Sequence, residues 1–237
     1  TALNWGIYGY FGEEKGAKNL VDDSNYLTRY LSATYPELPL FIIGHSMGSF
    51  VSRLQILHTA DLLNGYICLG TGGDNPAAPL ARAYAGALAG VKGPDTTSVI
   101  LDKGLDSTLQ KGLGIEEEND DWISHDPETI KAYREDPYSR FHFTNKGYAD
   151  LMDLQIAANE PEWFERVCKN LPIHFASGNE DPVSMMGRDI PKLEKRLKDN
   201  GVVDVSYKVY DGFRHEILNE VDRYTVYGDL VKWIKER

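Results

Sequence analysis

Short apolar runs and stretches with helical spacing alternate along most of the chain. Four runs rich in apolar residues lie at positions 40–43, 65–70, 173–177 and 205–209. Runs of about four to eight such residues, bounded by turn residues, are typical of buried strands. Around them, apolar residues recur with helical spacing at 20–31, 50–57, 186–200 and 224–235. This alternation predicts an α/β fold with a mostly parallel sheet flanked by helices.

The stretch from Gly72 to Asn170 interrupts the alternation, because it separates the second predicted strand from the third without a strand pattern of its own. Helical spacing predicts helices within it at 78–91, 127–135 and 144–158. We therefore expect a helical cap over residues 72–170, inserted into an α/β core formed by 1–71 and 171–237. The helix at 78–91 is small and apolar, which favours packing against other helices over contact with an apolar substrate.

Composition narrows the class of protein. The chain has 237 residues, 42% of them hydrophobic, as in a globular protein with one large core or a core with an inserted subdomain. Its net charge of -11 argues against nucleic acid as a partner, since such a surface needs clustered Lys and Arg. No run reaches the roughly 18 apolar residues of a membrane span, and residues 1–6 do not resemble a signal peptide. We expect a cytoplasmic location.

The sequence gives no indication of metal or cofactor chemistry. Cys68, in a predicted strand, and Cys168, in a predicted helix, are expected to be small core residues rather than a disulfide or metal pair. The acidic stretch 116–121 is expected to be a solvated loop, because consecutive carboxylates cannot all converge on one ion. We therefore predict neither a metal nor a cofactor.

The strand at 40–43 leads directly into a Gly-x-Ser-x-Gly motif at 44–48. The bare pattern often occurs by chance, but here an apolar strand precedes it and a helix follows it. In that context the serine lies on a sharp, strained strand-to-helix turn, and small residues on either side keep the backbone clear of it. We predict that Ser46 is a nucleophile. Its elbow would consist of Gly44, His45 and Gly48, and an ordinary glycine-rich turn is the alternative.

A serine hydroxyl needs a base to accept its proton and a carboxylate to orient that base. In this type of fold the acid and the histidine follow the serine in the order Ser, Asp, His, on loops at the carboxyl edge of the sheet. Asp181 follows the third predicted strand, and His215 follows the fourth. We therefore predict that Ser46, Asp181 and His215 form a catalytic triad.

Other residues compete for the roles of acid and base. Glu180 adjoins Asp181 and is its nearest rival, whereas Asp211 precedes a tight glycine turn. The remaining histidines are placed less well. His174 lies within a predicted strand, and His58 lies on the helix after the serine. His125 and His142 lie in the cap, and His45 adjoins the serine but is expected to point elsewhere.

Three segments resemble the nucleophile, acid and histidine segments of one known family. These segments, 44–48, 177–183 and 212–220, are similar to those of the monoglyceride lipase and lysophospholipase branch of the α/β-hydrolases. The resemblance continues through 70–73 and the predicted cap, so it covers nearly the whole chain. It implies a carboxylic ester or lipid as the substrate. It also implies an oxyanion hole to which the backbone amide of Met47 contributes.

The start of the chain departs from the family pattern. Family members begin with several strands and a His-Gly loop that supplies one oxyanion-hole amide, and this chain has no His-Gly pair. We therefore expect an N-terminally truncated core. In one interpretation Tyr8, Tyr10 or a backbone amide within 1–16 replaces the missing donor; in the other, this segment only covers exposed sheet. An uncovered edge beside the strand at 40–43 predicts a homo-oligomer.

Three functions remain open at this point. The first is a serine carboxylester hydrolase, a lipase or esterase of the monoacylglycerol or lysophospholipid type, whose cap selects the acyl chain. The second is a catalytically impaired binding protein with an α/β-hydrolase fold, or a fragment that needs a partner. The third keeps the triad but cleaves a peptide, as in related aminopeptidases, or a thioester.

Overall fold

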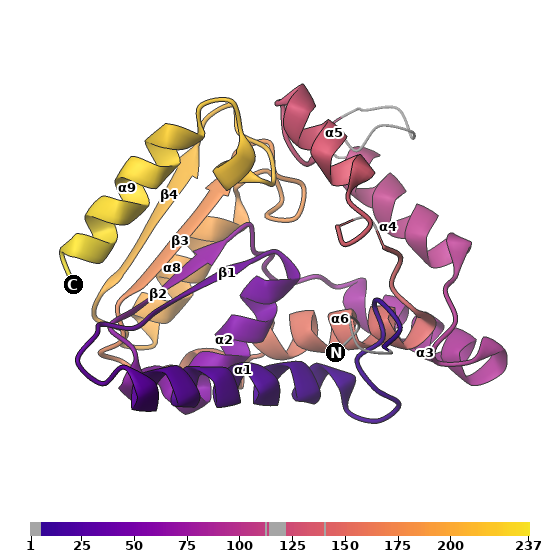
Figure 1. Cartoon of the computed structure of the whole chain (residues 1–237), viewed down its shortest axis with the longest axis horizontal. Helices are drawn as coiled ribbons and strands as arrows, with labels where there is room; N and C mark the ends of the chain where they lie inside the picture. Colours follow the sequence, from indigo (N-terminus) through magenta and orange to yellow (C-terminus); the bar gives the residue numbers. More distant parts are fainter. Residues whose placement is uncertain (1–5, 112, 114–121, 140) are drawn as a thin grey trace.

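Four parallel strands form a sheet in sequence order (Figure 1), within the residues that the structure describes, 6–111, 113, 122–139 and 141–237. In this computed structural model the strands are β1 (Phe41–His45), β2 (Gly65–Leu69), β3 (Ile173–Gly178) and β4 (Val205–Tyr210). The register pairs Phe41 with Gly65 and Ile173 with Val205, so the carboxyl ends of the strands meet at one edge. The predicted parallel α/β fold is confirmed.

Helices connect and flank the strands, in most cases where the sequence predicts them. The helices that precede β1, connect the strands or end the chain are α1 (Gly16–Thr34), α2 (Met47–Thr59), α8 (Asp189–Asp199) and α9 (Arg223–Lys235), with short 3-10 helices η2 (Ala60–Leu62) and η4 (Ile217–Asn219). Those between β2 and β3 are α3 (Ala78–Lys92), α4 (Val99–Lys111), α5 (Pro127–Glu135), α6 (Asn145–Asn159) and α7 (Pro161–Arg166). The helical patterns described above do not include α4 or α7. Among the described helices, none combines the length and the apolar character that crossing a membrane requires.

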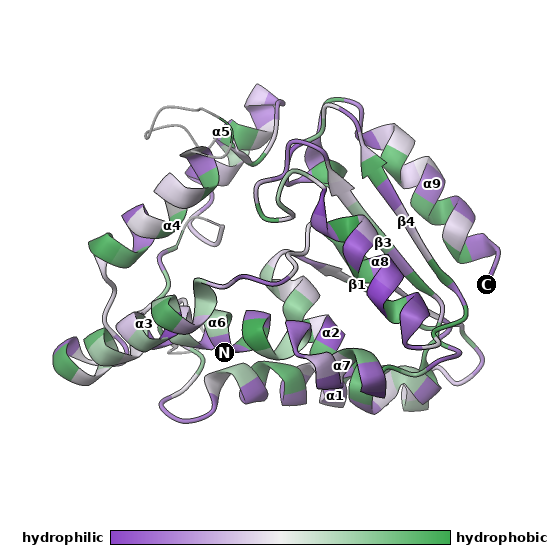
Figure 2. Ribbon diagram, turned by 180° about the vertical axis from the view of Figure 1, so that it is seen from behind, coloured by the Kyte–Doolittle hydropathy of each residue, from purple (hydrophilic) through white to green (hydrophobic). Residues whose placement is uncertain are grey.

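Alternating side chains on the strands divide the core into two layers. Tyr66 and Cys68 of β2 pack with residues of α2, α7 and α8 on one face. Ile67 and Leu69 point to the other face, where α9 covers them with Trp233 and its neighbours. Right-handed crossovers between sequential parallel strands place the connecting helices on one side of a sheet, which explains this arrangement. Figure 2 shows the hydrophilic residues of α8 along its outward side.

The two central strands are buried, and the outer strands are not. Every residue of β2 and β3 is buried, as expected for strands covered on both faces. In β1 the burial is partial, and the side chain of Ile43 is 50% exposed. Because β1 pairs only with β2 in the described part of the chain, its other edge carries unpaired backbone groups.

The helices between β2 and β3 divide into two groups. Figure 1 shows α3, α4 and α5 extending to one side of the sheet, with α5 returning beside the ends of β3 and β4. By contrast, Leu154 of α6 packs with Phe50 of α2, and Trp163 of α7 belongs to the cluster beneath the sheet. Since α6 and α7 share core clusters with α2, the division between core and cap remains a prediction.

The expectations for the two cysteines and for the acidic stretch have different outcomes. The prediction that Cys168 is a core residue in a helix is wrong, because α7 ends at Arg166 and Cys168 is exposed in the following turn. Cys68 is buried in β2. The acidic stretch 116–121 lies outside the described residues.

Arg53 of α2 links the helix after the serine to both ends of the long insertion. It is fully buried and donates hydrogen bonds to the carbonyl oxygens of Gly72 and Ala158. Its guanidinium also lies over the ring of Trp163, 4.4 Å from the ring centroid. The indole Nε1 of Trp163 donates to the carbonyl oxygen of Arg53 at 2.6 Å. These contacts fix the position of α2 relative to the base of the insertion.

Candidate active site

Ser46 lies between the last residue of β1 and the first residue of α2. Its φ of 54° and ψ of -124° are rare for a residue other than glycine. The amide of Ser46 donates to the carbonyl oxygen of Leu69 at 3.2 Å, at the end of the neighbouring strand β2. Its own carbonyl oxygen accepts from the amide of Ser49 at 2.9 Å in the first turn of α2. The strained turn therefore holds Ser46 at the carboxyl edge of the sheet.

The two glycines of the motif have different surroundings. A Cβ atom on Gly44 would lie 2.0 Å from Oγ of Ser52 and 2.7 Å from the carbonyl oxygen of Gly48. A Cβ atom on Gly48 would have no described neighbour within 4 Å. The turn therefore requires glycine at position 44, where the strand passes directly over α2, and tolerates a side chain at position 48.

Asp181 and His215 lie together in the structure. Nδ1 of His215 and Oδ1 of Asp181 are 2.9 Å apart, and both residues are buried. Asp181 also accepts hydrogen bonds from Oγ of Ser177 at 2.7 Å and from the amide of Val183 at 2.9 Å. Burial on its own raises the pKa of Asp181, but His215 and these two donors outweigh it and lower the pKa below its usual value. The carboxylate is therefore ionised near neutral pH.

His215 combines a paired nitrogen with an unpaired one. Burial disfavours its charged form, but the carboxylate of Asp181 outweighs this effect and raises the pKa of His215 above its usual value. Its Nε2 is buried and has no hydrogen-bond partner within the described residues. When Nδ1 donates to Asp181, Nε2 of the neutral ring is an acceptor. Such a nitrogen is suited to receive a proton from a nearby hydroxyl.

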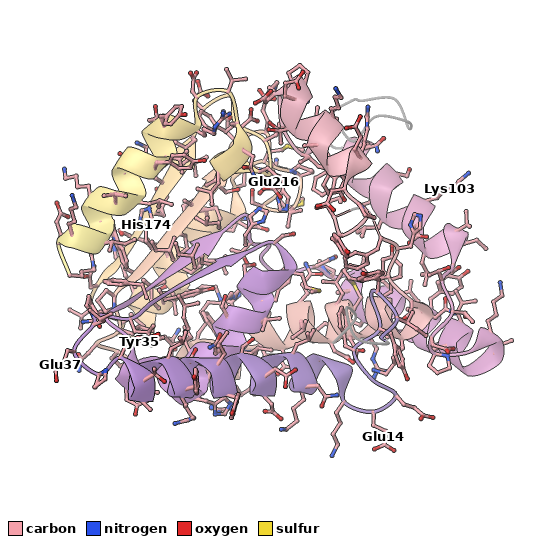
Figure 3. The ribbon with its side chains drawn as sticks, in the orientation of Figure 1. Glu14, Tyr35, Glu37, Lys103, His174 and Glu216 are labelled. Carbon is pink, nitrogen blue, oxygen red and sulfur yellow. The ribbon has the colours of Figure 1, made fainter. Side chains whose placement is uncertain are left out.

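The site brings Ser46 and His215 to the same edge of the sheet without a direct hydrogen bond between them. Leu69 accepts from the amide of Ser46, and Gly70, the next residue, lies against the ring of His215. A Cβ atom on Gly70 would be 3.0 Å from Cε1 of that ring. Figure 3 labels Glu216, the residue after His215, between the sheet and α5.

Two aromatic rings lie beside His215 in contacts that the sequence analysis did not predict. His45, expected to point away, packs with its ring centroid 4.6 Å from that of His215, and its Nε2 is 3.2 Å from the His215 carbonyl oxygen. Burial and the adjacent His215 lower the pKa of His45. The Trp122 ring, from the insertion, lies 5.1 Å from the His215 ring. No local sequence pattern marks either contact, because both depend on loops far apart along the chain.

The rival acids and histidines make other contacts. His125 lies between two glutamates: its Nε2 is 3.1 Å from Oε2 of Glu180, and its Nδ1 is 3.1 Å from Oε1 of Glu220. Asp211 accepts from the side chain of Asn179. His174 of β3 bonds to Ser206, and burial lowers its pKa to about 4, which keeps it neutral. Figure 3 shows His174 on the sheet, away from Glu216.

The described part of the N-terminal segment packs against the insertion. The ring of Tyr8 stacks on Phe141 with centroids 5.6 Å apart, and the carbonyl oxygen of Gly9 accepts from the amide of Thr144 at 3.2 Å.

At the serine turn, the amide of Met47 occupies the first position of α2, where a helix provides no internal acceptor. That amide points to the N-terminal end of the helix, where negative charge is stabilised.

Comparison with known proteins places the chain in a family. Residues 6–222 match the Hydrolase_4 family, described as serine aminopeptidase, S33. The chain belongs to this α/β-hydrolase family. It is also similar to a monoacylglycerol lipase of Mycolicibacterium smegmatis, with 28% identity over 221 residues that cover 90% of this chain and 68% of that protein. The monoglyceride lipase of Rattus norvegicus is 22% identical over 237 residues, which cover 95% and 70% of the two chains.

Solved structures of other proteins share the fold of this chain. A thermostable carboxyl esterase from Bacillus coagulans, solved in complex with glycerol, superposes on this chain with a TM-score of 0.89. The two sequences are 29% identical, and the match covers 100% of this chain and 76% of the esterase. A soluble variant of monoglyceride lipase from Saccharomyces cerevisiae, solved with a substrate analogue, gives a TM-score of 0.68 at 22% identity, with coverages of 96% and 71%. The second similarity concerns the fold alone.

The surroundings of the two glycines predict opposite effects of alanine. We expect Gly44→Ala to lower the stability by about 1 to 3 kcal/mol, or the Tm by about 2 to 12 °C, because the new methyl overlaps Ser52 and the backbone of Gly48. Gly48→Ala is the matched control and should leave the Tm unchanged or raise it slightly, since alanine favours a helix. Thermal unfolding monitored by circular dichroism measures both variants. Equal losses in the two would contradict this account of the turn.

Proposed function

We propose that the chain is a serine carboxylester hydrolase of the monoacylglycerol or lysophospholipid type. The observation that carries the proposal is the buried Asp181–His215 pair, whose free Nε2 lies at the same sheet edge as a serine with a positive φ. The similar proteins named above are lipases and an esterase, which favours an ester over other acyl compounds.

The proposed reaction has two halves, and all three side chains act in each. Oγ of Ser46 attacks the acyl carbon and transfers its proton to Nε2 of His215. Asp181 stabilises the imidazolium that forms, and Nε2 then passes the proton to the oxygen of the departing alcohol. Water then attacks the acyl carbon and gives a proton to Nε2 of His215. The bond between the acyl carbon and Oγ of Ser46 breaks, Oγ takes the proton from Nε2, and the carboxylic acid leaves. This chemistry requires no cofactor or metal.

The negative charge on the acyl oxygen needs hydrogen-bond donors. The amide of Met47, at the N-terminus of α2, is the donor that this chain provides in the proposed reaction. Loss of one donor from an oxyanion hole typically lowers turnover by about 100- to 1,000-fold, so a hole with one donor still allows slow hydrolysis of an activated ester. Activated esters are therefore the substrates of choice for a first test.

A serine aminopeptidase is the second candidate, because the family description names that activity. An amide bond is harder to cleave than an ester, and the same triad serves both reactions. A binding protein that retains the site without turnover, and a thioesterase, are the further alternatives. Substrate panels that contain an ester, a thioester and an amino-acid anilide separate these possibilities.

We also propose that the free edge of β1 pairs with a second copy of the chain. The edge carries unpaired backbone groups, and the half-exposed Ile43 adds apolar surface beside it. An antiparallel pairing of two β1 edges would satisfy these groups symmetrically.

Replacing the proposed nucleophile tests the enzymatic function. We expect Ser46→Ala to lower the rate on p-nitrophenyl esters of graded chain length by about 1,000-fold or more, because no other group can form the acyl-enzyme. Ser24→Ala, on the side of α1, is a matched control and should retain the full rate, since Oγ of Ser24 bonds only to the carbonyl oxygen of Leu20. Equal rates for wild type and Ser46→Ala would remove the enzymatic proposal.

The pKa of His215 predicts the pH dependence of activity. Only neutral His215 accepts the serine proton, so kcat/KM should fall as the pH drops through a pKa above the ordinary value of about 6.5. We expect Asp181→Asn to move this acidic limb to lower pH and to reduce kcat by about 1,000- to 10,000-fold. Glu180→Gln is the control and should leave the limb in place. A limb that stays unmoved in Asp181→Asn would disprove the assigned role of Asp181.

Light scattering tests the pairing of β1 edges. At micromolar concentration we expect the mass of a dimer for the wild-type chain. Ile43→Lys should shift the mass toward that of a monomer, because a charge on an edge strand opposes pairing. Val203→Lys replaces another exposed apolar residue away from β1 and should leave the dimer intact. A monomeric wild-type mass would rule out the pairing.

A further inference from the structure

Trp122 of the insertion is attached to the loop that carries His215. The carbonyl oxygen of Trp122 accepts from the amide of His215 at 3.4 Å, and that of Ile123 accepts from the amide of Glu216 at 2.8 Å. The rings of Trp122 and His215 are 5.1 Å apart and inclined by 40°. Two backbone contacts and one ring contact therefore hold this indole beside the proposed base.

The indole nitrogen of Trp122 is a buried donor with no acceptor. Its Nε1 is enclosed and makes no hydrogen bond within the described residues. Nε1 of Trp163 donates to Arg53, and Nε1 of Trp233 donates to Ser206. Buried polar groups are nearly always paired in folded proteins, so an unpaired donor beside the proposed base calls for an explanation. An indole N–H can only donate, which means that the missing partner is an acceptor such as oxygen.

A second unpaired nitrogen lies on the neighbouring ring. Nε2 of His215 is also buried without a partner, and in the neutral ring it is an acceptor. A donor and an acceptor on adjacent rings match a ligand that carries oxygen atoms and hydroxyl groups. In the proposed reaction Nε2 delivers a proton to the departing alcohol, so the alcohol portion of the ester lies on the side of His215.

We propose that Trp122 determines specificity by donating a hydrogen bond from Nε1 to an oxygen in the alcohol portion of the substrate. This inference rests on the proposed ester hydrolysis and names the feature that the site recognises, an oxygen-bearing head group. The hydroxyl groups of a glycerol ester and the phosphate oxygens of a lysophospholipid both provide such an acceptor. An ester of a simple apolar alcohol provides none beyond the ester itself.

The kinetic test compares three substrates that share one acyl chain: a monoacylglycerol, a lysophosphatidylcholine and an ethyl ester. Trp122→Phe keeps an aromatic ring beside His215 and removes the donor. We expect kcat/KM to fall by about 3- to 30-fold on one or both substrates with a polar head group, mainly through KM, and to remain within about twofold on the ethyl ester. The substrate that loses more identifies the head group. An equal fall on all three substrates, or no fall, overturns the proposal.

Two other tryptophans provide matched controls. Trp233→Phe removes an indole N–H that bonds to Ser206 under α9, and it should change none of the three rates. Stability gives a second comparison, because Trp122→Phe removes a donor that has no partner and should leave the Tm unchanged. Trp163→Phe leaves the carbonyl oxygen of Arg53 without its donor and should lower the Tm. A Tm loss in Trp122→Phe as large as that in Trp163→Phe would indicate a structural role and overturn the proposal.

A binding experiment tests Trp122 without any turnover. A monoalkylglycerol ether, which cannot be hydrolysed, is titrated into the Ser46→Ala variant while the indole N–H signals are followed by NMR. The Trp122 signal is assigned as the one that disappears in Trp122→Phe, and it should move downfield when the ether binds. We expect Trp122→Phe to weaken the affinity for the ether by about 3- to 30-fold, the effect of about one lost hydrogen bond. A stationary signal overturns the role of Trp122. Equal ester hydrolysis by wild type and Ser46→Ala, with a moving signal, overturns only the proposed function.

Discussion

The site depends on an ionised carboxylate kept away from water. Asp181 is buried, so its charge is tolerated only because His215 and several hydrogen-bond donors surround it. The donors to its carboxylate are Oγ of Ser177 and the amide of Val183, and Oγ of Ser184 closes the loop by donating to the backbone carbonyl oxygen of Asp181. Met185 and Met186 follow with positive φ values of 54° and 58°. Such torsions are unfavourable for methionine and persist where surrounding contacts enforce them. Of the described non-glycine residues with positive φ, Ser46, Met185 and Met186 lie in the loops of the candidate site, and Lys15 precedes α1.

The parallel sheet converts four separate stretches of sequence into one edge. Because β1 to β4 run in the same direction and in sequence order, the loops after β1, β2, β3 and β4 end side by side. The loop after β1 carries Ser46, that after β3 carries Asp181, and that after β4 carries His215. Gly70, after β2, fills the space between them with a backbone that lacks a side chain. The long insertion then adds Trp122 from outside the sheet.

Sequence patterns predicted the elements whose residues have simple surroundings. Apolar runs marked all four strands, and the bounds of α5 were predicted correctly at Pro127 and Glu135, where Asp126 caps the helix. The patterns omitted α4, whose buried residues Asp102 and Gln110 are polar, and α7, which has only six residues. Strand order placed Asp181 and His215 on neighbouring loops. The contacts of His45 and Trp122 were not predictable, since ring packing between distant loops leaves no periodic signal.

Arg53 has a consequence for how this molecule moves. It bonds to Gly72, where the insertion leaves the sheet, and to Ala158, near the point where it returns. Breaking either bond would leave a guanidinium in a dry interior, which is strongly unfavourable. Any opening motion that admits a ligand must therefore leave Gly72 and Ala158 in place, so that this part of the insertion stays rigid with α2. Entry to the serine is in this way separated from the alignment of the serine itself.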